Sequence, residues 1–193
     1  HTLLYTICWV DKLTEGAAST VYSVKDQLDP FAPLLVSNSD QILDNFNCTA
    51  FLEHGRGFDG NVLTYTPDYK LTIGETDKHS FIRIRFEEDG LSDAKDSSLS
   101  FKYQGIVCEV REKIVLGPNA LVGVHWFKSV QDFIEAYEYM VNRNLRAPNG
   151  EFYLSLCYQA MLEMGKNVTY TLLDKTAHYW CVGEPASYNL YRA

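Results

Sequence analysis

The sequence 33-PLLVSNSDQ-41 joins a short apolar run to a polar end, and it decides the fold that we predict. The run 34-LLV-36 does not alternate with polar residues, which favours a central strand buried on both faces. In open α/β sheets, ligands bind outside the carboxyl ends of the strands. Asp40 would stand at such an end, where a carboxylate can hold Mg²⁺ beside a phosphate. The alternative is that Asp40 caps a helix beginning at Gln41, because Asp is a favoured N-cap residue.

Strands and helices alternate on both sides of this stretch, which predicts an α/β fold with a mostly parallel central sheet flanked by helices. We expect one domain over residues 1–193, with a polar, antiparallel insertion over residues 67–104. Apolar and aromatic patterns predict strands over residues 3–10, 34–36, 61–66, 79–86, 105–113, 121–127, 168–173 and 179–182. Helical spacing predicts helices over residues 19–28, 45–54, 151–164 and 186–191, and one that Ser129 caps.

The composition argues against two classes of partner. A net charge of −8 and a pI near 5.1 disfavour a general binder of phosphate backbones, so no nucleic acid is expected. A small anionic ligand can still bind, because local groups make such a site. No apolar run reaches the roughly 18 residues needed to cross a bilayer, so no membrane partner is expected.

The cysteines are odd in number, dispersed and without a CxxC pair. This pattern predicts reduced, mostly buried thiols in a cytoplasmic protein. A homo-oligomer stays an open alternative. The five positions are Cys8, Cys48, Cys108, Cys157 and Cys181.

Motifs in chain order resemble the sugar-phosphate nucleotidyltransferases. They are 14-TEGAAST-20, 38-NSDQ-41, 112-EK-113, 123-GVHWF-127, 149-NGEFYL-154 and 180-WCVGEP-185. The resemblance covers nearly the whole chain, except the polar stretch around residues 87–100. It implies the nucleotide-diphosphosugar transferase fold, which is Rossmann-like. It also implies a reaction that joins a nucleoside triphosphate to a sugar 1-phosphate and releases pyrophosphate with Mg²⁺.

The resemblance assigns roles to particular residues. Asp40 corresponds to the metal-binding aspartate, and Lys113 to a lysine that acts as a point charge on the sugar phosphate. These two are the predicted catalytic residues. The predicted nucleotide-binding residues are Thr14, Glu15, Gly16, Ala17 and Ser39. The predicted sugar-phosphate-binding residues are Glu112, Lys113, Gly123 and Glu151.

Each assignment has a structural alternative. Residues 14–18 can be an ordinary turn into a helix, and Lys113 a solvated lysine at a strand end. Glu151 can be a favourable acid in the first turn of a helix, and Gly123 can simply ease packing. Structural roles are also expected for two histidines without metal spacing, His79 and His125. A core role is expected for the aromatic residues Tyr137, Tyr139, Phe152, Tyr153 and Tyr158.

The chain departs from the family pattern in two places. No glycine-rich loop with an Arg and a Lys precedes Thr14, and Cys181-Val182 stands where many members place a second metal-binding aspartate. We therefore expect a nucleotidyltransferase-like domain that is incomplete at its N-terminus. Three hypotheses stay open: an enzyme of this kind, a glycosyltransferase of related fold, and a non-catalytic binder of nucleotide or sugar phosphate. Pyrophosphate-dependent breakdown of a nucleotide-sugar separates the first two.

Overall fold

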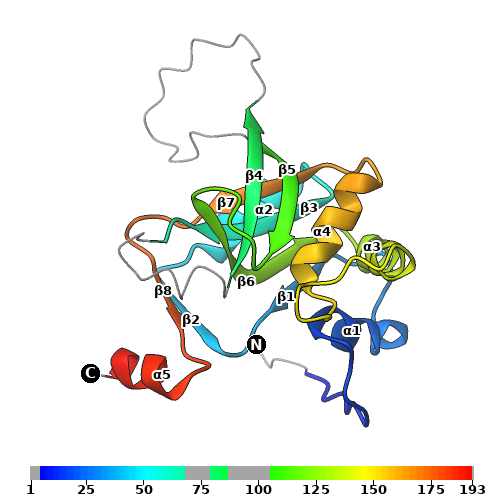
Figure 1. The fold of residues 1–193 in the computed structure, drawn as a ribbon, viewed down its shortest axis with the longest axis horizontal. Coiled ribbons are helices and arrows are strands. Elements are labelled where there is room, and N and C mark those ends of the chain that lie inside the picture. Colours follow the sequence, from blue (N-terminus) through cyan, green and yellow to red (C-terminus); the bar gives the residue numbers. More distant parts are fainter. Residues whose placement is uncertain (1–4, 68–78, 87–104, 193) are drawn as a thin grey trace.

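The computed structural model describes residues 5–67, 79–86 and 105–192 (Figure 1). The helices are α1 (Ala17–Tyr22), α2 (Cys48–Gly55), α3 (Val130–Asn142), α4 (Leu154–Glu163) and α5 (Pro185–Arg192), with a 3₁₀ helix at Lys25–Gln27. The strands are β1 (Leu34–Ser37), β2 (Gln41–Asp44), β3 (Gly60–Tyr65), β4 (Ser80–Phe86), β5 (Gly105–Glu112), β6 (Asn119–Phe127), β7 (Val168–Leu172) and β8 (His178–Cys181).

Six strands form one mixed sheet in the order β1-β6-β3-β7-β5-β4, and a further pairing of β4 with β6 closes it into a barrel. Strands β3 and β7 run parallel, whereas the other described pairs are antiparallel. The predicted α/β class is confirmed, but the prediction of a mostly parallel sheet is wrong. The apolar run of β6 is largely buried although its described neighbours are all antiparallel, so burial on both faces did not require parallel neighbours.

Strand β1 is an edge strand, and the prediction that residues 34–36 form a central strand is wrong. Among the described strands it pairs with β6 alone, in antiparallel register from Leu34 opposite Phe127 to Ser37 opposite Val124. Its side chains alternate between half-buried and exposed, and Leu35 is 42% exposed. A short apolar run indicates a preference for extended backbone, but it does not indicate how many strands pair with it.

The residues after Asp40 form a strand rather than a helix. Strand β2 pairs with β8 in antiparallel register, with Gln41 opposite Cys181 and Asp44 opposite His178, and the two lie side by side outside the barrel sheet (Figure 1). The alternative in which Asp40 caps a helix is therefore wrong. The side chain of Asp40 therefore does not cap a helix.

The described part of the first predicted strand, residues 5–10, is not a strand. Tyr5, Ile7 and Trp9 are 83%, 66% and 86% exposed. Aromatic and β-branched residues favour a strand only where a neighbouring strand accepts their hydrogen bonds, and no described strand pairs with this segment. The helix predicted over residues 19–28 is also shorter, since α1 ends at Tyr22 and the 3₁₀ helix follows.

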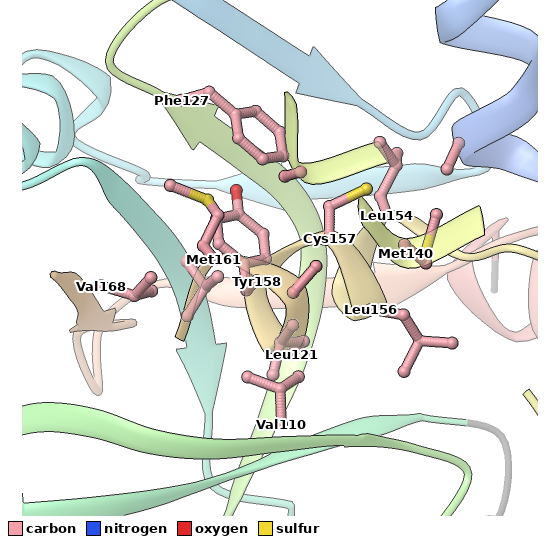
Figure 2. Close-up of a cluster of buried hydrophobic side chains, with 14 of the residues drawn as sticks. Val110, Leu121, Phe127, Met140, Leu154, Leu156, Cys157, Tyr158, Met161 and Val168 are labelled. Carbon is pink, nitrogen blue, oxygen red and sulfur yellow. The ribbon is translucent and has the colours of Figure 1, made fainter. Parts of the chain in front are cut away.

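The core lies where α4 packs between α3 and the barrel sheet (Figure 2). Tyr158 of α4 is fully buried, and its ring stacks on Phe127 with 4.8 Å between centroids. Its hydroxyl donates to the carbonyl of Trp126 at 3.2 Å. Phe152 is 1% exposed, so both of these aromatic residues belong to the core as predicted. None of the described helices is long and apolar enough to cross a membrane.

The prediction of mostly buried cysteines is wrong. Cys157 is buried on α4, whereas Cys8, Cys48, Cys108 and Cys181 are exposed. Cys48 opens α2, and Cys108 lies on an outward-facing position of β5. The N-cap predicted at Ser129 is confirmed, because its hydroxyl accepts a hydrogen bond from the backbone N–H of Asp132 at 3.0 Å.

His125 of β6 predicts a specific loss of stability in acid. It is 5% exposed, its Nδ1 has no hydrogen-bond partner among the described residues, and burial lowers its pKa to about 4. The unfolded chain takes up a proton on this imidazole below about pH 6.5, whereas the folded chain does not until about pH 4. The free energy of unfolding should therefore fall as the pH is lowered. This residue should account for a loss of about 2 kcal/mol between pH 7 and pH 5.

Urea unfolding at a series of pH values tests this. The slope of unfolding free energy against pH between 5 and 7 should be smaller in His125→Leu than in the parent chain. His178→Leu is the matched control, because His178 is exposed and its removal should leave the slope unchanged. An identical slope in all three proteins would contradict the neutral, buried state of His125.

Candidate functional site

Asp40 lies in the turn between β1 and β2, against the end of β8. Its backbone carbonyl accepts a hydrogen bond from the N–H of Val182 at 2.8 Å. Its carboxylate faces the backbone of Gly183, because a Cβ atom on Gly183 would lie 2.5 Å from Oδ2 of Asp40. Asp40 is exposed, and among the described residues its carboxylate accepts no hydrogen bond. The backbone of Asp40 is thus fixed by a hydrogen bond to Val182, while its carboxylate oxygens remain available to a ligand.

Gly123 of β6 lies directly beneath this turn. The side-chain amide of Gln41 forms two hydrogen bonds with the Gly123 peptide, donating from Nε2 to its carbonyl at 2.9 Å and accepting from its N–H at 3.0 Å. The backbone N–H of Asn38 also donates to that carbonyl at 2.8 Å. The side chain of Asn38 fills the space that a Cβ on Gly123 would need. This packing supports the structural alternative for Gly123, whereas its contact with a sugar stays a prediction.

The segment 14–18 is attached to the chain around Phe152. The N–H of Phe152 donates to the carbonyl of Glu15 at 2.7 Å, and the N–H of Ala18 donates to the carbonyl of Phe152 at 3.1 Å. Gly16 precedes α1 with φ 128°, and a Cβ there would lie 2.5 Å from the carbonyl oxygen of Phe152. The segment is therefore both the entry to a helix and a close-fitting backbone contact.

Glu112 is a buried carboxylate at the end of β5. It is 4% exposed, and the hydroxyls of Ser80 and Ser155 both donate to its Oε2, the second at 2.6 Å. Burial raises the pKa of Glu112, while the two serine hydrogen bonds and the charge of Lys113 act in the opposite direction. Its Oε1 accepts no hydrogen bond from the described residues.

Lys113 and Glu151 lie close to Glu112. Lys113 has a left-handed backbone with φ 59°, and its ammonium lies 5.3 Å from the ring centroid of Tyr153. A non-glycine residue in that region is uncommon and often belongs to a functional site. Glu151 is exposed, and its negative charge raises the pKa of Glu112. Because α4 begins at Leu154, Glu151 precedes the helix, and the alternative that placed it in a first helical turn is wrong.

The structure brings the predicted residues together in two groups. We define the Phe152 cluster as segment 14–17, Glu112, Lys113 and Glu151. We define the Asp40 cluster as Asp40, its sequence neighbour Ser39, and Gly123 beneath the turn. Strand β6 runs past both clusters. Its residue Ala120 pairs with Phe81, which is next to the Ser80 that contacts Glu112. Gly123 lies three residues further, about 10 Å along the strand.

The donor set at Asp40 fits one kind of metal site. The described residues contain no group of three or more His, Cys, Asp or Glu side chains that could hold a metal ion. A caged structural metal is therefore not supported there. Mg²⁺ commonly uses one or two carboxylates together with waters and substrate phosphates. The single open carboxylate of Asp40 fits a Mg²⁺ ion that arrives with a phosphate ligand.

Sequence reasoning missed the side chains that hold these groups together. Gln41 anchors the Asp40 turn to β6, Ser80 and Ser155 hold Glu112, and Arg146 contacts the Phe152 cluster. The only sequence signal was that Gln41 directly follows Asp40. The serines lie 32 and 43 positions from Glu112, and Glu15 lies 131 positions from Arg146, so no local spacing could have paired them.

Comparison with solved structures identifies the fold. A nucleoside-diphosphate-sugar pyrophosphorylase from Vibrio cholerae RC9 superimposes with a TM-score of 0.70 at 21% identity, over 94% of this chain and 66% of that one. A protein described as a glucose-1-phosphate thymidylyltransferase from Bacillus anthracis, in complex with sucrose, gives 0.63 at 14%, over 94% and 61%. A UDP-glucose pyrophosphorylase from Acinetobacter baumannii gives 0.63 at 12%, over 92% and 55%.

The chain thus has the fold of the sugar nucleotidyltransferases, as the sequence motifs predicted. It spans about two thirds or less of the length of these solved proteins. No protein family model matches the sequence, and no curated protein matches it.

Proposed function

We propose that this chain carries the sugar-phosphate side and part of the nucleotide side of a sugar-phosphate nucleotidyltransferase site. In this reaction a phosphate oxygen of a sugar 1-phosphate attacks the α-phosphorus of a nucleoside triphosphate. A new P–O bond forms, the bond between the α- and β-phosphates breaks, and pyrophosphate leaves. The products are a nucleotide-sugar and pyrophosphate.

One observation carries the proposal. Segments 14–17 and 112–113 are far from segment 151–153 in the sequence, yet both lie against it: segment 14–17 is hydrogen-bonded to the backbone of Phe152, and the Lys113 ammonium lies over the ring of Tyr153. By the resemblance, the first takes the nucleotide and the other two take the sugar phosphate. A site that must join two substrates needs such a junction, because holding both in reacting geometry removes much of the entropic barrier.

The described side chains suit these roles. The ammonium of Lys113 supplies a positive charge for the sugar phosphate, and the exposed carboxylate of Glu151 can accept hydrogen bonds from sugar hydroxyls. The space beside the Cα of Gly16 is filled by the backbone of Phe152, so a nucleotide would contact another side of segment 14–17. Asp40 would hold Mg²⁺, which supplies charge neutralisation to the phosphates when bound.

A thermal-unfolding screen tests the proposal. The chain is heated with ATP, CTP, GTP, UTP or dTTP, and with nucleotide-sugars, each in the presence of Mg²⁺ or EDTA. We expect one base to raise Tm selectively and only with Mg²⁺. At a hundredfold excess over Kd the added stability is about 2.7 kcal/mol, which is several degrees for a chain of this size.

No shift with any of these ligands, with or without Mg²⁺, would overturn the proposal for this chain. A shift with nucleotide-sugars but with no nucleoside triphosphate would instead favour the glycosyltransferase hypothesis. In a longer active form, pyrophosphate-dependent release of nucleoside triphosphate from a nucleotide-sugar would support the nucleotidyltransferase.

A further inference from the structure

Arg146 makes more directed contacts than any other arginine of the described residues. It lies in the connection between α3 and α4. Its guanidinium donates to Oε2 of Glu15, to the carbonyl of Gly150 and to Oδ1 of Asn144, each at 2.7 Å. The same group lies 3.9 Å from the ring centroid of Phe152. One planar side chain therefore contacts both the segment before α1 and the segment before α4.

These contacts are poorly explained by stability alone. The side chains of Arg146 and Glu15 are 33% and 65% exposed, so solvent screens their ion pair. Exposed pairs of this kind contribute at most about 1 kcal/mol. Several hydrogen bonds from one planar guanidinium instead fix the relative orientation of the groups that accept them, which a lysine ammonium cannot do. The arrangement is suited to holding two segments in a defined relative position.

The proposed function requires these two segments to hold a defined position relative to each other, because they bind the two substrates. Glu15 belongs to the predicted nucleotide-binding segment, and Gly150 precedes the predicted sugar-binding Glu151. The backbone bonds at Phe152 run between the same segments, and the N–H of Ala147 donates to the carbonyl of Glu151 at 3.0 Å. Arg146 also lines a surface hollow of about 210 Å³ together with Glu112. It thus contacts Glu15, Gly150 and Phe152, and it shares the wall of a hollow with Glu112.

We propose that Arg146 is a positioning residue that couples the nucleotide-binding segment 14–17 to the sugar-binding segment around Glu151. The inference rests on the proposed function, because it concerns the same two substrates. Arg146 contacts neither substrate in this proposal. It acts through Glu15 on one side and through the carbonyl of Gly150 on the other.

Three variants separate this role from a general loss of stability. Arg146→Ala should weaken the chain's affinity for its Mg²⁺-nucleoside triphosphate and for a sugar 1-phosphate, each about tenfold. Arg146→Lys keeps a positive charge near Glu15 but loses the fork, so nucleotide affinity should recover more than sugar 1-phosphate affinity. Glu15→Gln should weaken nucleotide binding alone, and should weaken it less in the Arg146→Ala background than in the parent chain. Arg143→Ala is the control, since the Arg143 guanidinium lies on the nearby Tyr139 ring and outside the cluster.

The measurements are titration calorimetry with the five Mg²⁺-nucleoside triphosphates and with glucose 1-phosphate and mannose 1-phosphate, and amide hydrogen exchange without ligand. In Arg146→Ala the amides of Ala18 and Phe152 should exchange faster, while those of β3 and β7 stay protected. Unchanged exchange at these two amides overturns the positioning role whether or not a ligand binds. Binding by the parent chain that Arg146→Ala leaves intact also overturns it, and the proposed function then stands. A parent chain that binds neither class of ligand overturns the proposed function and this role in it.

Discussion

Asp40→Asn should abolish the Mg²⁺-dependent stabilisation of the chain by nucleotide while leaving its folding almost intact. The substitution keeps the shape of the side chain but removes the charge and one acceptor oxygen. The structural contact of Asp40 with β8 runs through its backbone carbonyl and Val182, which the change does not touch. The metal would therefore lose the charged carboxylate of Asp40 as a ligand.

Thermal unfolding with and without ligand measures the effect. In the parent chain the ligand-induced gain at a hundredfold excess over Kd is about 2.7 kcal/mol, and in Asp40→Asn it should fall to near zero. Asp44→Asn is the matched control, because Asp44 is an exposed carboxylate at the far end of β2. An undiminished shift in Asp40→Asn would remove Asp40 from the metal site, and an equal loss in both variants would point to net charge instead.

The sequence located the elements around Asp40 but not their pairing. Residues 34–36 and the polar turn after them were placed correctly, because apolar and turn residues act over a few positions. The neighbours of β1 depend on contacts with β6, which lies some ninety residues away. A short apolar run carries no information on those contacts, and so an edge strand was predicted as a central one. Residues 5–10 failed for the same reason, since strand formation needs a partner strand.

The candidate site was predictable to a similar extent. The residues of the Phe152 cluster were named from the sequence, because each lies in a short motif that can be recognised without its neighbours in space. Arg146 and the serines that hold Glu112 were not found, since an arginine in a connection or a serine in a strand is ordinary. Their roles exist only through long-range contacts. Whether the gathered residues bind substrate stays a prediction that the experiments above test.

Gly16→Ala should destabilise the chain and detach the segment before α1. Gly16 has φ 128° and ψ 177°, a backbone conformation that is essentially restricted to glycine. A Cβ there would also lie 2.5 Å from the carbonyl oxygen and 2.8 Å from the nitrogen of Phe152. Both are backbone atoms, so no flexible side chain can move aside. Strain and overlap together should cost roughly 2–4 kcal/mol of unfolding free energy, or about 5–15 °C in Tm.

Two other glycines separate the causes of this loss. Gly57→Ala should change stability by less than about 0.5 kcal/mol, because a Cβ there meets nothing within 4 Å. Gly165→Ala should cost about 1–2 kcal/mol, because Gly165 has φ 78° but also an open space for a Cβ. The excess loss in Gly16→Ala then measures the close fit to Phe152. If Gly16→Ala lost no more than Gly165→Ala, and the Ala18 amide stayed protected from exchange, the segment would not be docked at Phe152, and the junction on which the proposed function rests would be absent.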